Sequence, residues 1–384
     1  MAGILAATCF GLWLYLICAR GRFWICPVRD GAVHAPLERW PAVAVVIPAR
    51  DEAETIAMSV QSLLRQNYPG CLSIVVVDDG SSDGTAEKAR RAAGDTNGPQ
   101  VTVITGGALP AGWTGKLWAL QQGIEAAEAS EERPDFLLLT DADIVHAPDT
   151  LTWLTAHAAR GRYVLTSLMA KLRCESLAER SHVAAFVYFF QMLFPFTWVC
   201  RADLRTAAAA GGCMLVDAAA LRLAGGIGSV RDALIDDCSL AKRLKQSGPI
   251  WLGLTDRVRS LRPYVRLADV RQMIARSAYA QLRFSPLLLA GTVAGMAATF
   301  LLAPLFAVFA TGLARELALA TWLLMALSFL PTLRFYRQSP LWGPALPVIA
   351  LLFTLYTLDS AYQHWRGRGG RWKGRVHLGA ASLR

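Results

Sequence analysis

Three pairs of acidic residues each follow a short run of Val, Ile or Leu, and their chemistry suits a divalent cation and a nucleotide. The pairs are Asp51 and Glu52, Asp78 and Asp79, and Asp141 and Asp143. In an open α/β sheet, ligands bind beyond the carboxyl ends of the strands. The spacing therefore predicts a single site for a nucleotide and a cation where these strands end.

Asp141 and Asp143 are the candidate cation ligands. Residues two apart in an extended segment point to the same side, so both carboxylates can face one hard cation that prefers oxygen ligands. Mg²⁺ or Mn²⁺ would share its other positions between water and a diphosphate. An Asp-x-Asp pair alone is most often a solvated loop pair, but here it follows a buried-looking strand and accompanies two similar groups.

The elements that must position these groups alternate between strand and helix from about Trp40 to about Leu267. The expected strands are Val43–Ile47, Ile74–Val77, Val101–Ile104 and Phe136–Leu139, and the expected helices are Glu54–Arg65, Thr85–Ala93 and Lys116–Ala129. Such alternation predicts an α/β domain with a mostly parallel sheet.

A fourth acidic pair, Asp236 and Asp237, stands further along the chain, after Gly211 and Gly212 and the strand expected to follow them. Adjacent carboxylates near a bound anion raise one another's pKa, which suits a general base. The alternative is a structural one, because acidic residues also favour the first turn of a helix such as the one expected at Cys238–Leu244.

Lys116 ends the segment Gly112-Trp113-Thr114-Gly115-Lys116 just before an expected helix. The spacing is not that of a P-loop, yet a glycine turn with a lysine at a helix start favours an anion. The competing interpretation is a turn with Trp113 packed beneath it.

Composition points to a membrane protein. Hydrophobic residues make up 54% of the chain and the mean hydropathy is +0.34. The apolar segments expected to span a bilayer are Ala2–Ala19, Leu287–Leu313, Leu317–Leu333 and Leu341–Ala361. Three full spans after a cytoplasmic domain would leave the basic C-terminal tail outside, against the positive-inside tendency, so one of them is expected to be re-entrant or interfacial.

The net charge of +10 is concentrated next to these apolar segments, with seven arginines between Arg257 and Arg283 and a second basic cluster near the end of the chain. Charge in this position favours a membrane surface over nucleic acid. The aromatic run Phe186–Val199 has two interpretations, a buried core helix or an interfacial helix at the mouth of the site. The eight cysteines form no Cys-x-x-Cys pair, which argues against zinc and fits a reducing compartment.

Between residues 42 and 285 these motifs resemble glycosyltransferase family 2, which has the GT-A fold. The resemblance implies that a nucleotide-sugar contacts Asp78, Asp79, Lys116, Asp141 and the segment containing Pro48, Ala49, Arg50 and Glu52. It implies that Asp237, next to Asp236, is the catalytic base and that Gly211 and Gly212 belong to the acceptor half. Gln281, Arg283 and Phe284 stand where membrane members carry Gln-x-x-Arg-Trp, with a shorter spacing and Phe for Trp. The resemblance implies that Arg283 contacts the diphosphate of the nucleotide-sugar and that Gln281 and Phe284 lie in the acceptor region.

Among subgroups, the chain looks most like the hopanoid-biosynthesis-associated glycosyltransferases, with a more distant likeness to ceramide glucosyltransferases. This resemblance implies a multi-pass inner-membrane enzyme with a cytoplasmic catalytic domain. Such an enzyme would move a sugar from a UDP-sugar to a lipid acceptor, with inversion and with Mg²⁺ or Mn²⁺. The alternatives are a processive polysaccharide synthase and a non-catalytic membrane scaffold. The expected domains are an anchor at 1–24, a GT-A domain at 40–267, a basic segment at 268–285, membrane helices at 286–362 and a basic tail at 363–384.

Overall fold

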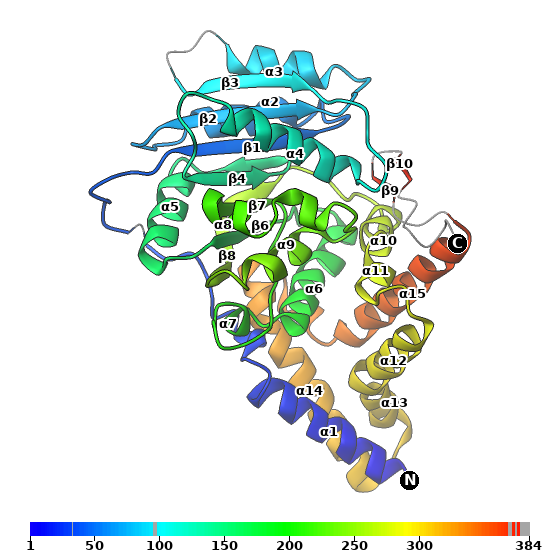
Figure 1. Cartoon of the computed structure of the whole chain (residues 1–384). Helices are drawn as coiled ribbons and strands as arrows, with labels where there is room; N and C mark the ends of the chain where they lie inside the picture. Colours follow the sequence, from blue (N-terminus) through cyan, green and yellow to red (C-terminus); the bar gives the residue numbers. More distant parts are fainter. Residues whose placement is uncertain (33, 95–97, 368–370, 373–374, 377–384) are drawn as a thin grey trace. The chain divides into compact units, whose positions relative to one another are not determined.

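An eight-stranded mixed sheet in the order β3-β2-β1-β4-β7-β6-β8-β5 dominates the first part of the computed structural model (Figure 1). Its strands are β1 (Val43–Ala49), β2 (Leu72–Asp78), β3 (Gln100–Thr105), β4 (Phe136–Thr140), β5 (Ile144–His146), β6 (Leu165–Lys171), β7 (Cys213–Asp217) and β8 (Ile250–Ser260). The structure describes all residues except 33, 95–97, 368–370, 373–374 and 377–384. The four strands predicted from the sequence are confirmed as β1 to β4, each extended by one to three residues.

The chain divides into two compact units. The sheet unit comprises Val28–Leu172 and Trp198–Arg262, with Arg371–Arg384. The helical unit comprises Met1–Pro27, Arg173–Thr197 and Pro263–Gly370. Residues 173–197, within the expected GT-A domain at 40–267, belong to the helical unit.

Strand direction explains why distant residues meet at one edge of the sheet. β1 pairs in parallel with β2 and β4, and Ala49 lies opposite Asp78 where β1 and β2 end. β7 runs antiparallel to β4, so its first residue, Cys213, lies opposite Thr140 at the end of β4. β6 is antiparallel to β7 and parallel to β8, so β8 also ends at this edge. The sheet is thus mostly parallel in its first half and mixed in its second.

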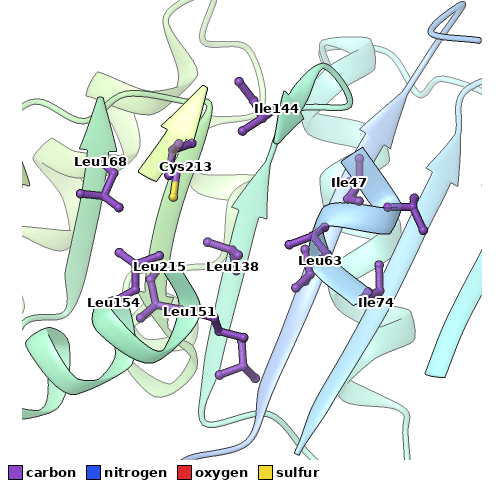
Figure 2. Packing of buried hydrophobic residues seen from close by; sticks show 14 of the residues in the cluster. Ile47, Leu63, Ile74, Leu138, Ile144, Leu151, Leu154, Leu168, Cys213 and Leu215 are labelled. Atoms are coloured by element: carbon purple, nitrogen blue, oxygen red, sulfur yellow. The ribbon is translucent and has the colours of Figure 1, made fainter. Parts of the chain in front are cut away.

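Helices cover both faces of the sheet. Those of the sheet unit are α2 (Ile56–Leu64), α3 (Thr85–Ala93), α4 (Gly115–Glu128), α5 (Thr150–Gly161), α8 (Ala218–Leu223), the turn η2 (Ile227–Val230) and α9 (Asp236–Leu244), and α7 (Phe196–Val199) lies at the boundary between the units. Figure 2 shows one core layer, in which Ile47, Ile74 and Leu138 of the strands lie with Leu63 of α2 and Leu151 of α5. β1 is buried on both faces along its whole length, as apolar strands of parallel sheets are.

The helical unit consists of α1 (Ala2–Cys18), η1 (Phe23–Ile25), α6 (Leu177–Leu193), α10 (Leu267–Ala275), α11 (Ala278–Gln281), α12 (Pro286–Met296), η3 (Ala297–Leu301), α13 (Leu302–Phe309), α14 (Gly312–Phe335), η4 (Pro340–Trp342) and α15 (Leu346–Trp365). Two short strands, β9 (Arg371–Trp372) and β10 (Arg375–Val376), form an antiparallel pair. Most of the expected basic tail lies outside the described residues.

Two helices among the described residues are long and apolar enough to cross a membrane, Pro286–Phe309 and Gly312–Phe335. The expected span at 287–313 is interrupted, because the helix ends at Phe309 and Gly312 adopts a φ of +58°. A π-turn at Ala297–Leu301 precedes Pro304, whose ring displaces the carbonyl of the preceding turn.

The expected N-terminal span is not confirmed. α1 has 17 residues, so it extends about 26 Å and is shorter than the roughly 30 Å hydrocarbon core. The third expected C-terminal span corresponds to α15, which has 20 residues but is not among the candidate spans.

Candidate active site

The ends of β1 and β2 form the first part of the site. Arg50 donates a hydrogen bond to the backbone oxygen of Asp79, and its guanidinium lies 3.6 Å from the Asp79 carboxylate. Asp78 is buried, and its Oδ1 has no hydrogen-bond partner among the described residues. An acceptor left unpaired away from water costs free energy, so this oxygen suits a donor group on a ligand. Pro48 and Ala49, the last residues of β1, supply the backbone beside it.

A network of hydrogen bonds fixes the loop after β1 against the loop after β2. The backbone N–H of Asp51 donates to Ser81 Oγ at 3.0 Å, and that of Glu52 donates to Thr85 Oγ1 at 2.9 Å. Asp83 accepts from the N–H of Thr85 at 3.1 Å and also from that of Ala53 at 3.0 Å. Glu52 is therefore held at the end of the sheet by backbone contacts.

Lys116 links Asp141, the first aspartate of the Asp-x-Asp pair, to Asp236 of the fourth acidic pair. Its ammonium lies 3.0 Å from Asp141 Oδ1 and 3.0 Å from Asp236 Oδ2. It sits at the start of α4, where Thr114 caps the helix by accepting from the N–H of Leu117. Burial lowers the pKa of Lys116, but Asp141 and Asp236 raise it by more, so the lysine stays charged. The sequence prediction placed an anion here, and in this structure the anions are the protein's own carboxylates.

Asp143 has a different cationic partner. Arg262, just beyond β8, donates through Nε to Asp143 Oδ2 at 2.8 Å and through Nη2 to Glu52 Oε1 at 2.5 Å. Burial lowers the pKa of Arg262, and Asp143 and Glu52 raise it by more. The sequence analysis missed Arg262 because it treated the arginines from Arg257 onward as charge next to the membrane. Its position directly after a strand and before Pro263 was the available signal.

Asp237 lies in the first turn of α9. Its Oδ2 accepts from the N–H of Gly211 at 3.0 Å and its Oδ1 from the N–H of Cys238 at 2.7 Å. Burial and the neighbouring Asp236 raise the pKa of Asp237 to about 6, against the lowering effect of Lys116. A carboxylate with this pKa is ionised at neutral pH and takes up a proton more readily than an ordinary aspartate.

Gly211 and Gly212 bring their chain segment close to these groups. A Cβ on Gly211 would lie 3.3 Å from Lys116 Nζ and 3.4 Å from Asp237 Oδ2. The carbonyl of Gly212 accepts from Thr140 Oγ1 at 2.7 Å. The segment of the two glycines thus contacts both the end of β4 and the start of α9.

The residues fit a divalent cation in their donor chemistry. The described residues contain no group of three or more His, Cys, Asp or Glu side chains arranged for a metal. Asp141 and Asp143 alone would leave several positions to water and a diphosphate, as Mg²⁺ prefers. The Lys116 ammonium, midway between Asp141 and Asp236, shows that these oxygens already hold a positive charge.

Gln281, Arg283 and Phe284 belong to the helical unit, at the corner between α11 and α12. Arg283 and Phe284 both have a positive φ, and the Phe284 ring stacks on His364 with centroids 4.3 Å apart. None of the three belongs to the sheet unit that contains the carboxylates, and their expected contact with the donor or the acceptor stays a prediction.

Residues 44–222 match the model of the family described as Glycosyl transferase family 2. This segment, somewhat less than half of the chain, is therefore similar to family 2 glycosyltransferases. Among solved structures, the chain is similar to that of a mannosyltransferase from Pyrobaculum calidifontis in complex with GDP-Man and Mn²⁺, with a TM-score of 0.57 and 19% identity. That match covers 92% of this chain and 99% of the mannosyltransferase, and it shows a common fold.

Two curated relatives match shorter segments. An N-acetylglucosaminyltransferase of Mesorhizobium japonicum is 35% identical over 120 residues, which cover 30% of this chain and 26% of that protein. An undecaprenyl-phosphate 4-deoxy-4-formamido-L-arabinose transferase of Pseudomonas aeruginosa is 33% identical over 135 residues, which cover 34% and 36%. The chain thus matches about a third or less of the length of these relatives.

Proposed function

We propose that this protein is a membrane-bound, inverting glycosyltransferase that moves a sugar from a nucleotide-sugar to the hydroxyl of a lipid. The observation that carries the proposal is the meeting of three acidic groups at one edge of the sheet, with Lys116 lying 3.0 Å from both Asp141 and Asp236. A nucleotide site and a candidate base are thereby brought to one place.

The donor would lie along the ends of β1, β2 and β4. Asp78 and Asp79 would accept hydrogen bonds from the nucleotide's base, since an ionised carboxylate only accepts hydrogen bonds. Asp141 and Asp143 would hold a divalent cation, which supplies charge stabilisation to the departing diphosphate. The Mn²⁺ bound with GDP-Man in the Pyrobaculum structure supports this assignment.

Transfer would proceed by one in-line displacement. The acceptor oxygen attacks the anomeric carbon, the bond to the diphosphate breaks, and its electron pair leaves with the diphosphate. Asp237 takes the proton of the acceptor hydroxyl. Its partly buried position and a pKa raised to about 6 support this role.

The lipid acceptor rests on two observations outside the sheet unit. Two helices are long and apolar enough to cross a bilayer, and one relative acts, by its name, on undecaprenyl-phosphate. The comparisons give no support to the narrower hopanoid assignment, so the proposal keeps to a lipid as a class.

The test uses the full chain, purified in detergent, with UDP-sugars and GDP-sugars as donors. Two acceptors are compared, a polyprenol and a polyprenyl phosphate. Transfer of a single sugar to the polyprenol would support the proposal. Chains of many sugars would indicate a processive synthase, and transfer to the phosphate alone would show that the acceptor needs no base. Donor binding without any transfer would support the scaffold interpretation.

A further inference from the structure

Arg262 contacts Asp143, one of the two candidate cation ligands. Its guanidinium bridges Asp143 and Glu52, at 2.8 Å and 2.5 Å, and its side chain is 35% exposed. The side chains of Asp143 and Glu52 are far more buried, with only 10% and 12% of their surface exposed. The arginine thus covers two buried carboxylates and keeps part of its own surface open.

The other two basic side chains of the site are anchored differently. The Lys116 ammonium is held between Asp141 and Asp236. Arg50 contacts Asp79, on the side of the site where the nucleotide's base would bind. Like Lys116 on Asp141, Arg262 contacts a candidate cation ligand, Asp143, but its side chain is more exposed, at 35% against 20%. A divalent ion on Asp143 Oδ2 would repel the guanidinium that now lies 2.8 Å from this atom.

We propose that Arg262 is the arginine that binds the donor's diphosphate, and that it occupies Asp143 as a substitute cation until the diphosphate and a divalent ion arrive. Glu52 keeps hold of Nη2 while the rest of the guanidinium turns from Asp143 to the phosphate oxygens. A guanidinium is suited to this exchange, because its fork of N–H groups binds carboxylate and phosphate with the same geometry. The inference rests on the proposed function.

This assignment replaces Arg283, which the resemblance placed at the diphosphate. Arg283 is exposed and belongs to the helical unit, whereas Arg262 directly follows β8 and contacts two of the predicted site residues. The direction of β8 explains its place, since this strand ends at the same edge of the sheet as β4.

The experiment compares the full chain with Arg262→Gln, Arg262→Lys and the matched control Arg283→Gln. Titration calorimetry measures the binding of UDP, GDP, UMP and GMP, and electron paramagnetic resonance measures the binding of Mn²⁺ alone. We expect Arg262→Gln to weaken diphosphate binding by about tenfold or more, as loss of a charge-assisted contact does. Monophosphate binding should change by less than about threefold, and Arg262→Lys should recover part of the loss.

Mn²⁺ binding without nucleotide distinguishes exchange from a structural role. Removal of the competing guanidinium should leave Mn²⁺ affinity unchanged or tighter in Arg262→Gln. Equal loss of Mn²⁺, monophosphate and diphosphate binding would overturn the inference, as would a selective loss of diphosphate binding in Arg283→Gln. If the unaltered chain binds neither UDP nor GDP, the proposed function fails together with the inference.

Discussion

Three basic residues neutralise the acidic end of the sheet, and each comes from a different element. Arg50 follows β1, Lys116 begins α4 and Arg262 follows β8. Without them, the clustered carboxylates would repel one another and some would take up protons. The same positive charges would also face an anionic donor, so the ion pairs that stabilise these carboxylates prepare the site for a diphosphate.

Asp237 gives the most direct test of the chemistry at the scale of a single residue. Asp237→Asn keeps the size of the side chain but removes its ability to take a proton. With a hydroxyl acceptor, turnover should fall by about a hundredfold or more while donor affinity changes little. Steady-state kinetics and calorimetry measure the two quantities. Asp256→Asn is the matched control, because Asp256 is 60% exposed and pairs with Lys171. Equal loss of rate and donor affinity would give Asp237 a structural role.

The raised pKa of Asp237 also predicts a pH dependence. A general base works only when ionised, and its pKa is raised to about 6. The value of kcat/KM should therefore be level above this pH and fall as the pH drops through about 6. Lys116 lowers the pKa of Asp237, so Lys116→Met should move this acidic limb to higher pH. An unmoved limb would show that another group controls it.

The sequence predicted the acidic residues of the site better than their basic partners. Carboxylates after apolar strands form a local pattern, readable without any knowledge of pairing. The contacts of Arg262 with Asp143 and Glu52 join residues 119 and 210 positions apart. Such contacts depend on the order and direction of strands. The direction of β8 follows from the antiparallel pairings of β7 with β4 and with β6, which no local sequence pattern predicts.

At the scale of an element, helix α4 positions Lys116 by lying very close to the sheet. A Cβ on Gly123 would stand 2.4 Å from Val46 Cγ1 and 2.9 Å from Val77 Cγ2, and both valines belong to buried strands. The glycine is therefore required by the packing distance between helix and sheet. A displaced α4 would carry the Lys116 ammonium away from Asp141 and Asp236.

Gly123→Ala should consequently destabilise the protein by about 1–3 kcal/mol, the usual cost of overpacking a core. Donor affinity should also fall, even though residue 123 lies in the core and not at the site. Thermal unfolding and calorimetry measure both effects. Glu125→Ala on the exposed side of the same helix should change stability by about 0.5 kcal/mol or less. Normal stability and affinity in Gly123→Ala would show that α4 can shift without consequence.

The aromatic run at 186–199 illustrates how tertiary packing decides between two interpretations of one pattern. Phe189 of α6 is buried at 8% exposure, and its ring meets Phe300 and Phe353 at centroid distances of 5.4 and 4.9 Å. It is a core residue of the helical unit. Phe190 and Phe194 remain partly exposed and contact each other at 5.3 Å, so the interfacial interpretation stays a prediction for the exposed side chains of the run, these two among them.

Phe189→Ser should therefore destabilise the helical unit by about 3 kcal/mol or more, since it leaves a cavity and buries a hydroxyl. Leu193→Ser, on the same helix at 51% exposure, is the control and should have a much smaller effect. Thermal unfolding in detergent compares them. Similar stabilities for the two variants would mean that Phe189 is not a core residue of the helical unit.

At the scale of the whole molecule, the basic stretch 257–283 serves two purposes. Arg257 pairs with Asp30 at 2.7 Å and with Asp149 at 3.0 Å, and Arg262 pairs with Asp143 and Glu52, so both belong to the sheet unit. The remaining arginines, from Arg266 onward, lie in the helical unit. The arginines of this stretch were all expected next to the membrane, but those up to Arg262 belong to the sheet unit and those from Arg266 onward to the helical unit.

Two candidate spans remove a conflict that three spans created. Three spans would separate the basic tail from the basic segment before Pro286. Two spans, Pro286–Phe309 and Gly312–Phe335, return the chain to the side from which it started. Arg276 and Arg283 would then share a side with Arg334 and Arg337, as the positive-inside tendency favours. Only 17% of the first span is buried, so lipid is a suitable cover for it.

This hairpin makes a prediction about accessibility across the membrane. Leu313, just after the break between the spans, and Leu341, beyond the second span, are 70% and 82% exposed. Leu313→Cys and Leu341→Cys should react with a membrane-impermeant maleimide from opposite sides of sealed vesicles. Asp256→Cys marks the side of the sheet unit, and Leu341→Cys should react together with it. The exposed Cys18 and Cys71 are first replaced by serine. Labelling of Leu313→Cys and Leu341→Cys from the same side would exclude a two-span hairpin, and labelling of Leu341→Cys opposite to Asp256→Cys would mean that the chain crosses the bilayer an odd number of times between them.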